Sequence, residues 1–250
     1  MVGEIDLRKI LFIDIETVSQ GKMLSELPER MQDLWAKKSR YFLKDYDESI
    51  EIDEKYSLSY SDKAAIFAEF GKIICISVGV LYRKEDGNYG FRVKSFSGED
   101  EKELLITFSD LLSKHYNDPA RFYLCGHNIR EFDVPYICRR MVVNRLALPD
   151  IVNLSGKKPW ETKHLIDTLE LWKFGDIKHF TSLDLLTAIL DIPSPKDDID
   201  GSQVGKVYWE QKNLPRIVDY CEKDVVTVAN LLLRFQGLEL IDPEAISKIN

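Results

Sequence analysis

Two acidic residues at the end of an apolar run constrain this chain more than any other feature of its sequence. The segment Lys9–Ile15 (KILFIDI) is short, Ile-rich and apolar, which is typical of a buried β-strand. Asp14 and Glu16 are two positions apart, so they project to the same face of that strand. Carboxylates leaving a buried strand cost free energy unless a positive charge compensates them. The pair indicates either a shared metal ion or a chance arrangement, since Asp-x-Glu recurs at Asp242 and Glu244 in a proline-containing tail.

The other hydrophobic patterns predict a single α/β domain over residues 1–250, with a mixed sheet and helices packed on it. Two apolar stretches, 73–82 and 89–96, flank a turn at 85–88 and predict a β-hairpin. Further strands are expected at 121–125 and 164–169, and helices at 61–70, 99–116, 133–146, 181–190 and 215–235. The helix at 61–70 is expected to stop at Gly71.

A long connection, about 19–70, separates the first strand from the hairpin. Apolar residues at helical spacing between Leu24 and Trp35 predict a helix within it, so we interpret the segment as a helical insertion. Solvated helices packed on the core are one interpretation, and a lid, a substrate guide or a partner surface is the other.

The composition of the chain excludes few classes of protein. A formal net charge of −8 argues against a protein that coats nucleic acid nonspecifically, because such binding depends on many Lys/Arg–phosphate contacts. It does not exclude an enzyme that holds a few nucleotides through metal-binding carboxylates. No apolar run is long enough to span a bilayer, so no membrane association is expected. The four cysteines (Cys75, Cys125, Cys138, Cys221) form no C-x-x-C motif and are interpreted as buried thiols of a cytoplasmic protein.

A second motif, Gly126-His127-Asn128-Ile129-Arg130-Glu131-Phe132-Asp133, runs from the end of one predicted strand to the start of a helix. Taken alone, Asp133 is explained as the N-cap of that helix. Asn128 can order the loop through its side-chain amide.

A third motif, Tyr220-Cys221-Glu222-Lys223-Asp224, lies in the last long helix. Tyr220 and Asp224 are one turn apart on the same helix face. The Tyr-x-x-x-Asp spacing also occurs at Tyr41/Asp45 and Tyr82/Asp86, so spacing alone is weak evidence. Only the copy at Tyr220 lies in an amphipathic helix, where an Asp among apolar neighbours needs an explanation.

The three motifs, in this order and these contexts, resemble those of the DnaQ-like 3′→5′ exonuclease superfamily in its tyrosine (DEDDy) subgroup. More closely, the sequence resembles the exonuclease domain of family B DNA polymerases, in the stand-alone predicted PolB-like exonuclease branch. The resemblance covers about 9–236, and includes the stretches GHNIREFDVPYICRR and IVDYCEKDVVTVANLLLRF. It implies a ribonuclease-H-like fold: a mixed five-stranded sheet with helices on both faces, plus the insertion. No polymerase motif is present.

The resemblance also implies the chemistry. Asp14, Glu16, Asp133 and Asp224 would bind two divalent cations, Mg²⁺ or Mn²⁺, which hard oxygen ligands favour over zinc. The resemblance implies roles for other residues in the same way: Tyr220 would orient the attacking water, Thr17 would contact the terminal nucleotide through its backbone, and Asn128 and Phe132 would bind phosphate and sugar or base. In the sister subgroup a His takes the place of the tyrosine; here that position is Asp219, so neither His127 nor His179 is invoked.

The expected substrate is the 3′ end of a nucleic acid, from which nucleoside 5′-monophosphates are released one at a time. Single-stranded or frayed DNA is favoured over RNA by analogy with family B. The alternatives are an exoribonuclease and a catalytically silent module that binds nucleic acid or protein. The sequence indicates no particular protein partner. Candidate phosphate contacts, each also explained as a solvated surface charge, are Arg139, Arg140, Arg145, Lys157, Lys158 and Lys163.

Overall fold

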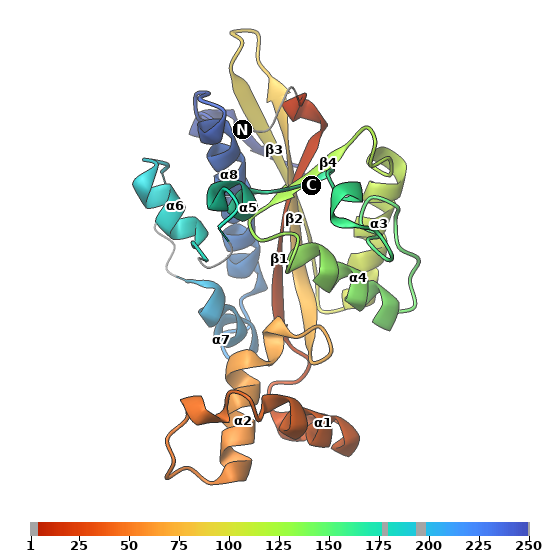
Figure 1. The fold of residues 1–250 in the computed structure, drawn as a ribbon, viewed down its shortest axis with the longest axis vertical. Coiled ribbons are helices and arrows are strands. Elements are labelled where there is room, and N and C mark those ends of the chain that lie inside the picture. Colours follow the sequence, from red (N-terminus) through yellow and green to blue (C-terminus); the bar gives the residue numbers. More distant parts are fainter. Residues whose placement is uncertain (1–4, 177–179, 194–198, 250) are drawn as a thin grey trace.

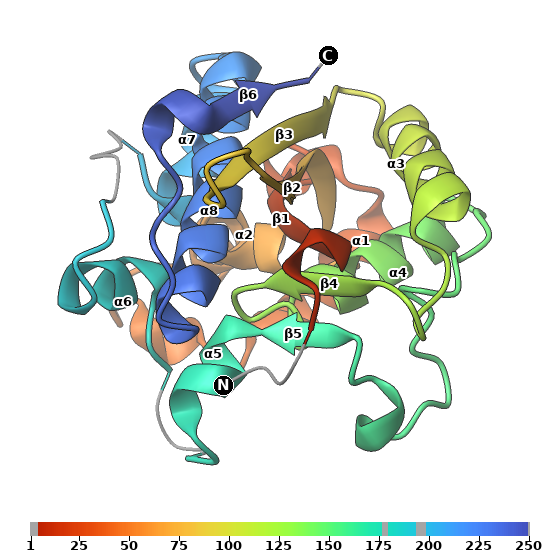
Figure 2. The ribbon, with the colours of Figure 1, turned by 90° about the horizontal axis from the view of Figure 1, so that it is seen from above.

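The central feature of the computed structural model, which describes residues 5–176, 180–193 and 199–249, is a mixed sheet (Figures 1 and 2). Six strands lie in the order β5-β4-β1-β2-β3-β6. Their bounds are β1 Ile10–Ser19, β2 Gly71–Arg83, β3 Tyr89–Ser97, β4 Tyr123–Gly126, β5 Leu165–Asp167 and β6 Ile246–Lys248. The predicted α/β class and the first five strands are confirmed. The sixth strand comes from the segment after Asp242 that the sequence presented as a tail.

The strands β1, β2 and β3 form an antiparallel meander, and β4 and β5 add in parallel on the other side of β1. The predicted hairpin is therefore present. The strand β1 runs through the middle of the sheet and is ten residues long, so Asp14 and Glu16 lie within it and not at its end. In the antiparallel register Asp14 lies opposite Ser77, and Glu16 opposite Cys75.

Helices cover both faces of the sheet, as predicted. Alternate side chains of β1 divide between them: Leu11, Ile13 and Ile15 pack in the core under α3 (Glu101–His115) and α4 (Asp133–Val143). Ile10 and Phe12 pack instead against α8 (Leu214–Phe235). Figure 2 shows α8 and α3 on opposite sides of the strands. The shorter helices are α5 Thr168–Lys173, α6 Leu183–Ile189 and α7 Val204–Trp209.

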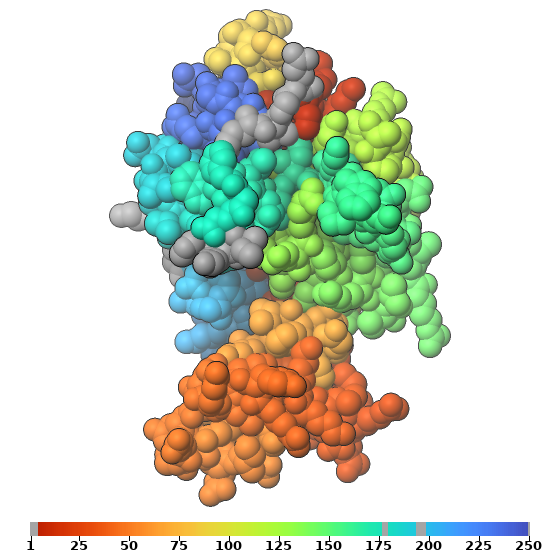
Figure 3. All heavy atoms as spheres, viewed as in Figure 1, coloured from red at the N-terminus to blue at the C-terminus, as the bar shows by residue number. Residues whose placement is uncertain are grey.

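The insertion forms a helical lobe at one end of the molecule (Figure 3). It contains α1 (Glu29–Ser39) and α2 (Ile52–Lys63), with a small core of its own around the fully buried Trp35. The expected helix at 61–70 is wrong in its bounds, because α2 ends at Lys63 and a 3-10 turn at Ala64–Ile66 follows. Gly71 begins β2, where a Cβ atom would lie 2.2 Å from the Tyr136 hydroxyl, so close packing explains the glycine.

None of the helices in the described part of the chain combines the length and hydropathy needed to cross a bilayer. The four cysteines are free thiols, three of them buried and Cys138 partly exposed.

Candidate active site

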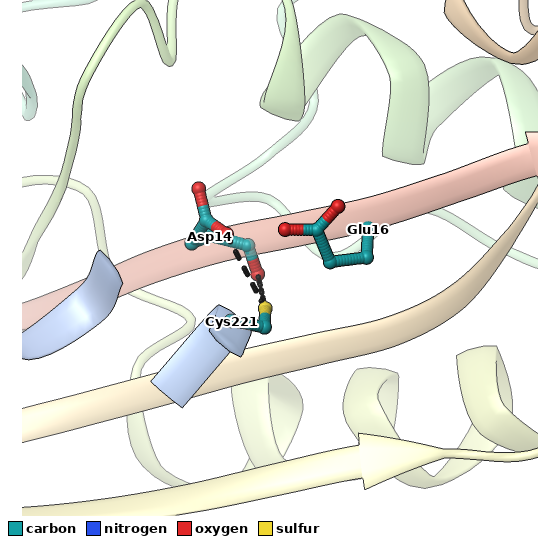
Figure 4. Close-up of side chains that lie close together, drawn as sticks. All are labelled: Asp14, Glu16 and Cys221. Atoms are coloured by element: carbon teal, nitrogen blue, oxygen red, sulfur yellow. Dashed lines mark hydrogen bonds between the residues drawn. The ribbon is translucent and has the colours of Figure 1, made fainter. Parts of the chain in front are cut away.

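The strand β1 presents Asp14 and Glu16 on the face of the sheet that α8 covers. Their even positions continue the series of Ile10 and Phe12, which pack against α8. Glu16 is buried, with 7% of its surface exposed, and Asp14 is partly buried. Figure 4 shows the two carboxylates side by side on the strand. The i, i+2 argument from the sequence therefore places them as the structure does.

The helix α8 brings a second set of side chains to this point. The Cys221 thiol donates to Asp14, with 3.3 Å between Sγ and Oδ2 and 3.5 Å to the backbone oxygen (Figure 4). Single ligand atoms of Asp14, Glu16 and Cys221 all lie within 4.8 Å of one another. Asp224 follows one turn later and interacts electrostatically with Asp14 and Glu16. Tyr220 is hydrogen-bonded to Asp224.

Asp133 reaches the same place from the other side of β1. The strand β4 pairs with β1 only as far as Cys125 opposite Phe12, and it ends at Gly126, so the edge of β1 is open beyond that point. There the Asp133 carboxylate lies near the N–H groups of Ile15 and of Asp133 itself. Phe132 occupies the N-cap position of α4. The interpretation of Asp133 as an N-cap is thus wrong, because Asp133 is the first residue of α4 itself and its carboxylate lies beside the edge of β1.

Burial and mutual repulsion govern the protonation of these acids. Burial raises the pKa of Asp14 and of Glu16 well above the ordinary range, and the neighbouring carboxylates raise both further. Burial also raises the pKa of Asp133, to about 7, although the nearby N–H groups of Ile15 and of Asp133 itself oppose the shift. Among the described residues, no lysine, arginine or histidine forms an ion pair with Asp14, Glu16 or Asp133.

This donor set fits hard divalent cations. Gathered carboxylates without a cationic side chain are costly in a buried site, and a bound cation removes that cost. Oxygen ligands suit Mg²⁺ or Mn²⁺. Two soft atoms lie nearby: the Cys221 thiol is engaged as a donor to Asp14, and Cys75 lies opposite Glu16 on β2.

A residue that the sequence did not single out orders the loop before α4. Asp167, at the end of β5, accepts hydrogen bonds from the Asn128 N–H (2.9 Å) and the Arg130 N–H (3.1 Å). It also caps α5 through the Leu169 N–H (3.0 Å). The signal was present in the stretch HLIDT, where an Asp between a strand and a helix indicates an N-cap.

The residues expected to contact the substrate, Thr17, Phe132 and Asn128, lie in different surroundings. The Thr17 hydroxyl donates to the Ala65 carbonyl (2.9 Å), the same oxygen that accepts from Tyr136, so its side chain lies on the face opposite the acids. Only its backbone is available beside them. Phe132 packs against Tyr136, with ring centroids 5.4 Å apart. Asn128 has a left-handed backbone (φ 65°), which its loop position requires.

Two further residues take structural roles. Both ring nitrogens of His127 are hydrogen-bonded, to Thr168 Oγ1 and to the Thr181 carbonyl, each at 2.9 Å. Arg140 is not a surface phosphate contact, because it is buried and paired with Glu101 at 2.6 Å. Arg139, Arg145, Lys158 and Lys163 are exposed, and Lys157 is partly so. His179 lies outside the described residues.

Comparison with known proteins points to one family. The family model described as a predicted 3′–5′ exonuclease related to the exonuclease domain of PolB matches residues 66–245. The match begins after β1, so it does not include Asp14 and Glu16. No curated protein matches the chain in sequence.

Among solved structures, the family B DNA polymerase from the hyperthermophilic archaeon Pyrobaculum calidifontis is similar, with a TM-score of 0.52 and 16% identity. The similarity covers 91% of this chain and 24% of the polymerase. It therefore supports the fold, and the chain corresponds to about a quarter of that protein's length.

Proposed function

Because the chain belongs to the family of predicted 3′–5′ exonucleases related to the exonuclease domain of PolB, we propose that it is a metal-dependent 3′–5′ exonuclease. Its substrate would be single-stranded or frayed DNA, shortened one nucleoside 5′-monophosphate at a time. The observation that carries the proposal is the meeting of Asp14, Glu16, Asp133 and Asp224 from β1, α4 and α8, beside Tyr220.

The four carboxylates would hold two divalent cations, Mg²⁺ or Mn²⁺. When bound, such cations activate water and stabilise the charge that develops on the scissile phosphate and the leaving oxygen. The raised pKa of Asp14 and Glu16 supports this role, because acids that repel one another when ionised gain most from a shared positive charge.

The chain's own residues bind and orient the reactants. Burial and the neighbouring carboxylates raise the pKa of Tyr220, so the phenol keeps its proton at neutral pH and orients the attacking water as a hydrogen-bonding group. The backbone at Thr17 would contact the terminal nucleotide, with Asn128 and Phe132 at the phosphate and sugar. Water then attacks the terminal phosphorus in line, the bond to the 3′ oxygen of the preceding nucleotide breaks, and that oxygen takes up a proton.

The proposal is tested with purified protein, a 5′-labelled single-stranded oligodeoxynucleotide, and Mg²⁺ or Mn²⁺. Stepwise shortening from the 3′ end is expected, and chelation of the metal should stop it. Asp14→Asn should lower the rate at least about 100-fold, more than the loss of residues that merely support metal ligands. Full activity of Asp14→Asn, or no digestion by the wild type, would refute the proposal.

Two alternatives remain distinct outcomes of this assay. A 3′–5′ exoribonuclease would digest the matched RNA faster, since the four acids do not read the 2′-hydroxyl. A silent binding module would bind the oligonucleotide without shortening it; the presence of all four acids and the tyrosine argues against it.

A further inference from the structure

A polar groove lies between the insertion and α7, next to the far end of β1. Its volume is about 550 Å³. Lys22 and Met23 line it from the insertion, Lys206 and Trp209 from α7, and Ser19 and Ala65 at its base. Figure 1 shows α7 and α2 next to each other where β1 runs down towards the insertion.

The groove lies further along β1 than the acidic site, at the end of that strand. Ser19 is three residues beyond Glu16 on the same strand, so the groove begins roughly 10 Å from the acids at the usual rise of a strand. A chain whose end lies at the acids would have this groove directly behind it.

The lining offers an aromatic ring held in a fixed orientation. The Trp209 indole N–H donates to Ser19 Oγ (3.1 Å), which fixes the ring against the end of β1. Tyr208 packs edge-on against it, with centroids 4.9 Å apart. Two ammonium groups lie over the same ring, Lys72 at 5.4 Å and Lys212 at 5.1 Å from its centroid, and a base that stacks on the indole takes the place of the exposed Lys212 side chain.

Charge gives the groove only a weak preference for anions. Lys22 and Lys206 form no ion pair with any residue that the structure describes, but Asp62 and Glu210 also line the groove. Asp62 accepts a hydrogen bond from the Tyr46 hydroxyl (2.7 Å). Stacking on a ring with a few phosphate contacts is the way proteins hold unpaired nucleotides without reading their sequence.

We infer that this groove binds the single strand immediately behind the terminal nucleotide, with a base stacked on Trp209 and phosphates near Lys22 and Lys206. The inference rests on the proposed exonuclease function and adds the path of the substrate. It assigns the insertion the role of a substrate guide and requires an unpaired 3′ region, because a paired base has no free face for the indole.

The experiment compares two substrates, of which only one is long enough to reach the groove. A ten-nucleotide oligothymidylate would occupy it, whereas the p-nitrophenyl ester of thymidine 5′-monophosphate would contact the acids alone. With Mn²⁺, Trp209→Ala should raise KM for the oligonucleotide about 10-fold, within the range of one lost base–aromatic stack, and leave ester hydrolysis unchanged. Lys206→Ala should have a smaller effect of the same kind.

Matched variants separate stacking from folding. Trp209→Phe keeps a ring but loses the bond to Ser19, so it should retain most of the oligonucleotide affinity. Trp160→Ala removes an exposed tryptophan that does not line the groove, and should change neither substrate. If Trp209→Ala slows both substrates equally, or if Trp209→Phe is as weak as Trp209→Ala, the groove does not bind the strand by stacking.

Direct binding keeps the inference testable if hydrolysis fails. Fluorescence anisotropy of the 5′-labelled oligothymidylate with Ca²⁺ gives Kd without turnover. A wild type that hydrolyses neither substrate refutes the proposed function, while equal Kd values for wild type and Trp209→Ala refute the groove.

Discussion

Tyr220 shows how one side chain is constrained by the acids around it. Its phenol is hydrogen-bonded to Asp224 and lies within the electrostatic influence of Glu16 and Asp14. Burial and these negative charges disfavour the phenolate, so the raised pKa of Tyr220 excludes it as a strong base at neutral pH. What the phenol supplies is a hydrogen bond in a fixed direction.

Removing that hydroxyl tests this role. Tyr220→Phe should lower kcat about 100-fold, towards the lower end of what a positioned proton-transfer group contributes, and leave the Mn²⁺ concentration for half-maximal rate unchanged. Steady-state kinetics over a metal titration measures both. Tyr116→Phe, at a tyrosine that packs edge-on against Phe122, is the control and should behave as wild type. A large increase in the metal requirement of Tyr220→Phe would show a role in metal binding instead.

At the scale of elements, the end of β4 makes room for the site. Because β4 stops at Gly126, the edge of β1 at Ile15 is not covered by a strand, and Asp133 at the start of α4 lies beside it. A Cβ atom at Gly126 would lie 3.0 Å from the Ile13 oxygen and 2.9 Å from Ile129, so a larger residue there would move β4. Asp167 then fixes the intervening loop.

Asp167→Ala should therefore damage the loop and the site together. It leaves the N–H groups of Asn128, Arg130 and Leu169 without their acceptor, which we expect to lower the free energy of unfolding by about 2–3 kcal/mol. Chemical denaturation measures that loss, and oligonucleotide digestion should fall with it because Asp133 follows this loop. Asp100→Ala removes a comparable cap from α3 and should cost stability without a matching loss of rate at low denaturant.

The sequence predicted those parts of the site that depend on local periodicity. The i, i+2 spacing in a strand and the i, i+4 spacing in a helix placed Asp14 with Glu16, and Tyr220 with Asp224. The sequence could not show that β4 ends at Gly126, so Asp133 was interpreted as an N-cap. The end of α2 was predicted incorrectly, because the sequence does not distinguish a glycine that ends a helix from one that close packing requires. Gly71 is of the second kind, since it packs against Tyr136.

Contacts between residues far apart in the sequence could not be predicted from local patterns either. The segment that looked like a tail is a strand because it pairs with β3, and Lys248 joins it to α8 through ion pairs with Asp219 and Glu222, each 2.6 Å. The contact of Cys221 with Asp14 joins residues more than two hundred positions apart, and no local pattern indicates it.

For the whole molecule, the cluster of acids couples stability to pH. Asp133 has a pKa of about 7 in the folded chain, against an ordinary value of 3.8. An acid with a raised folded pKa favours folding while it is protonated in the fold, so its contribution is complete below about pH 4 and is lost as the pH rises through 7. Asp14 and Glu16 shift in the same direction. Bound divalent cations require the deprotonated carboxylates and should oppose this trend.

The metal-free protein should accordingly become less stable between pH 6 and pH 8.5, where ordinary carboxylates do not titrate. Asp133 alone accounts for about 1 kcal/mol, or about 2–4 °C in Tm for a chain of this size. Thermal unfolding in chelator measures the fall, and millimolar Mn²⁺ should reduce or reverse it. Asp133→Asn cannot ionise, so its Tm should depend less on pH than that of the wild type. Equal pH slopes for wild type and Asp133→Asn in chelator would mean that this carboxyl is already ionised at pH 6, and that the burial of the cluster does not govern its protonation.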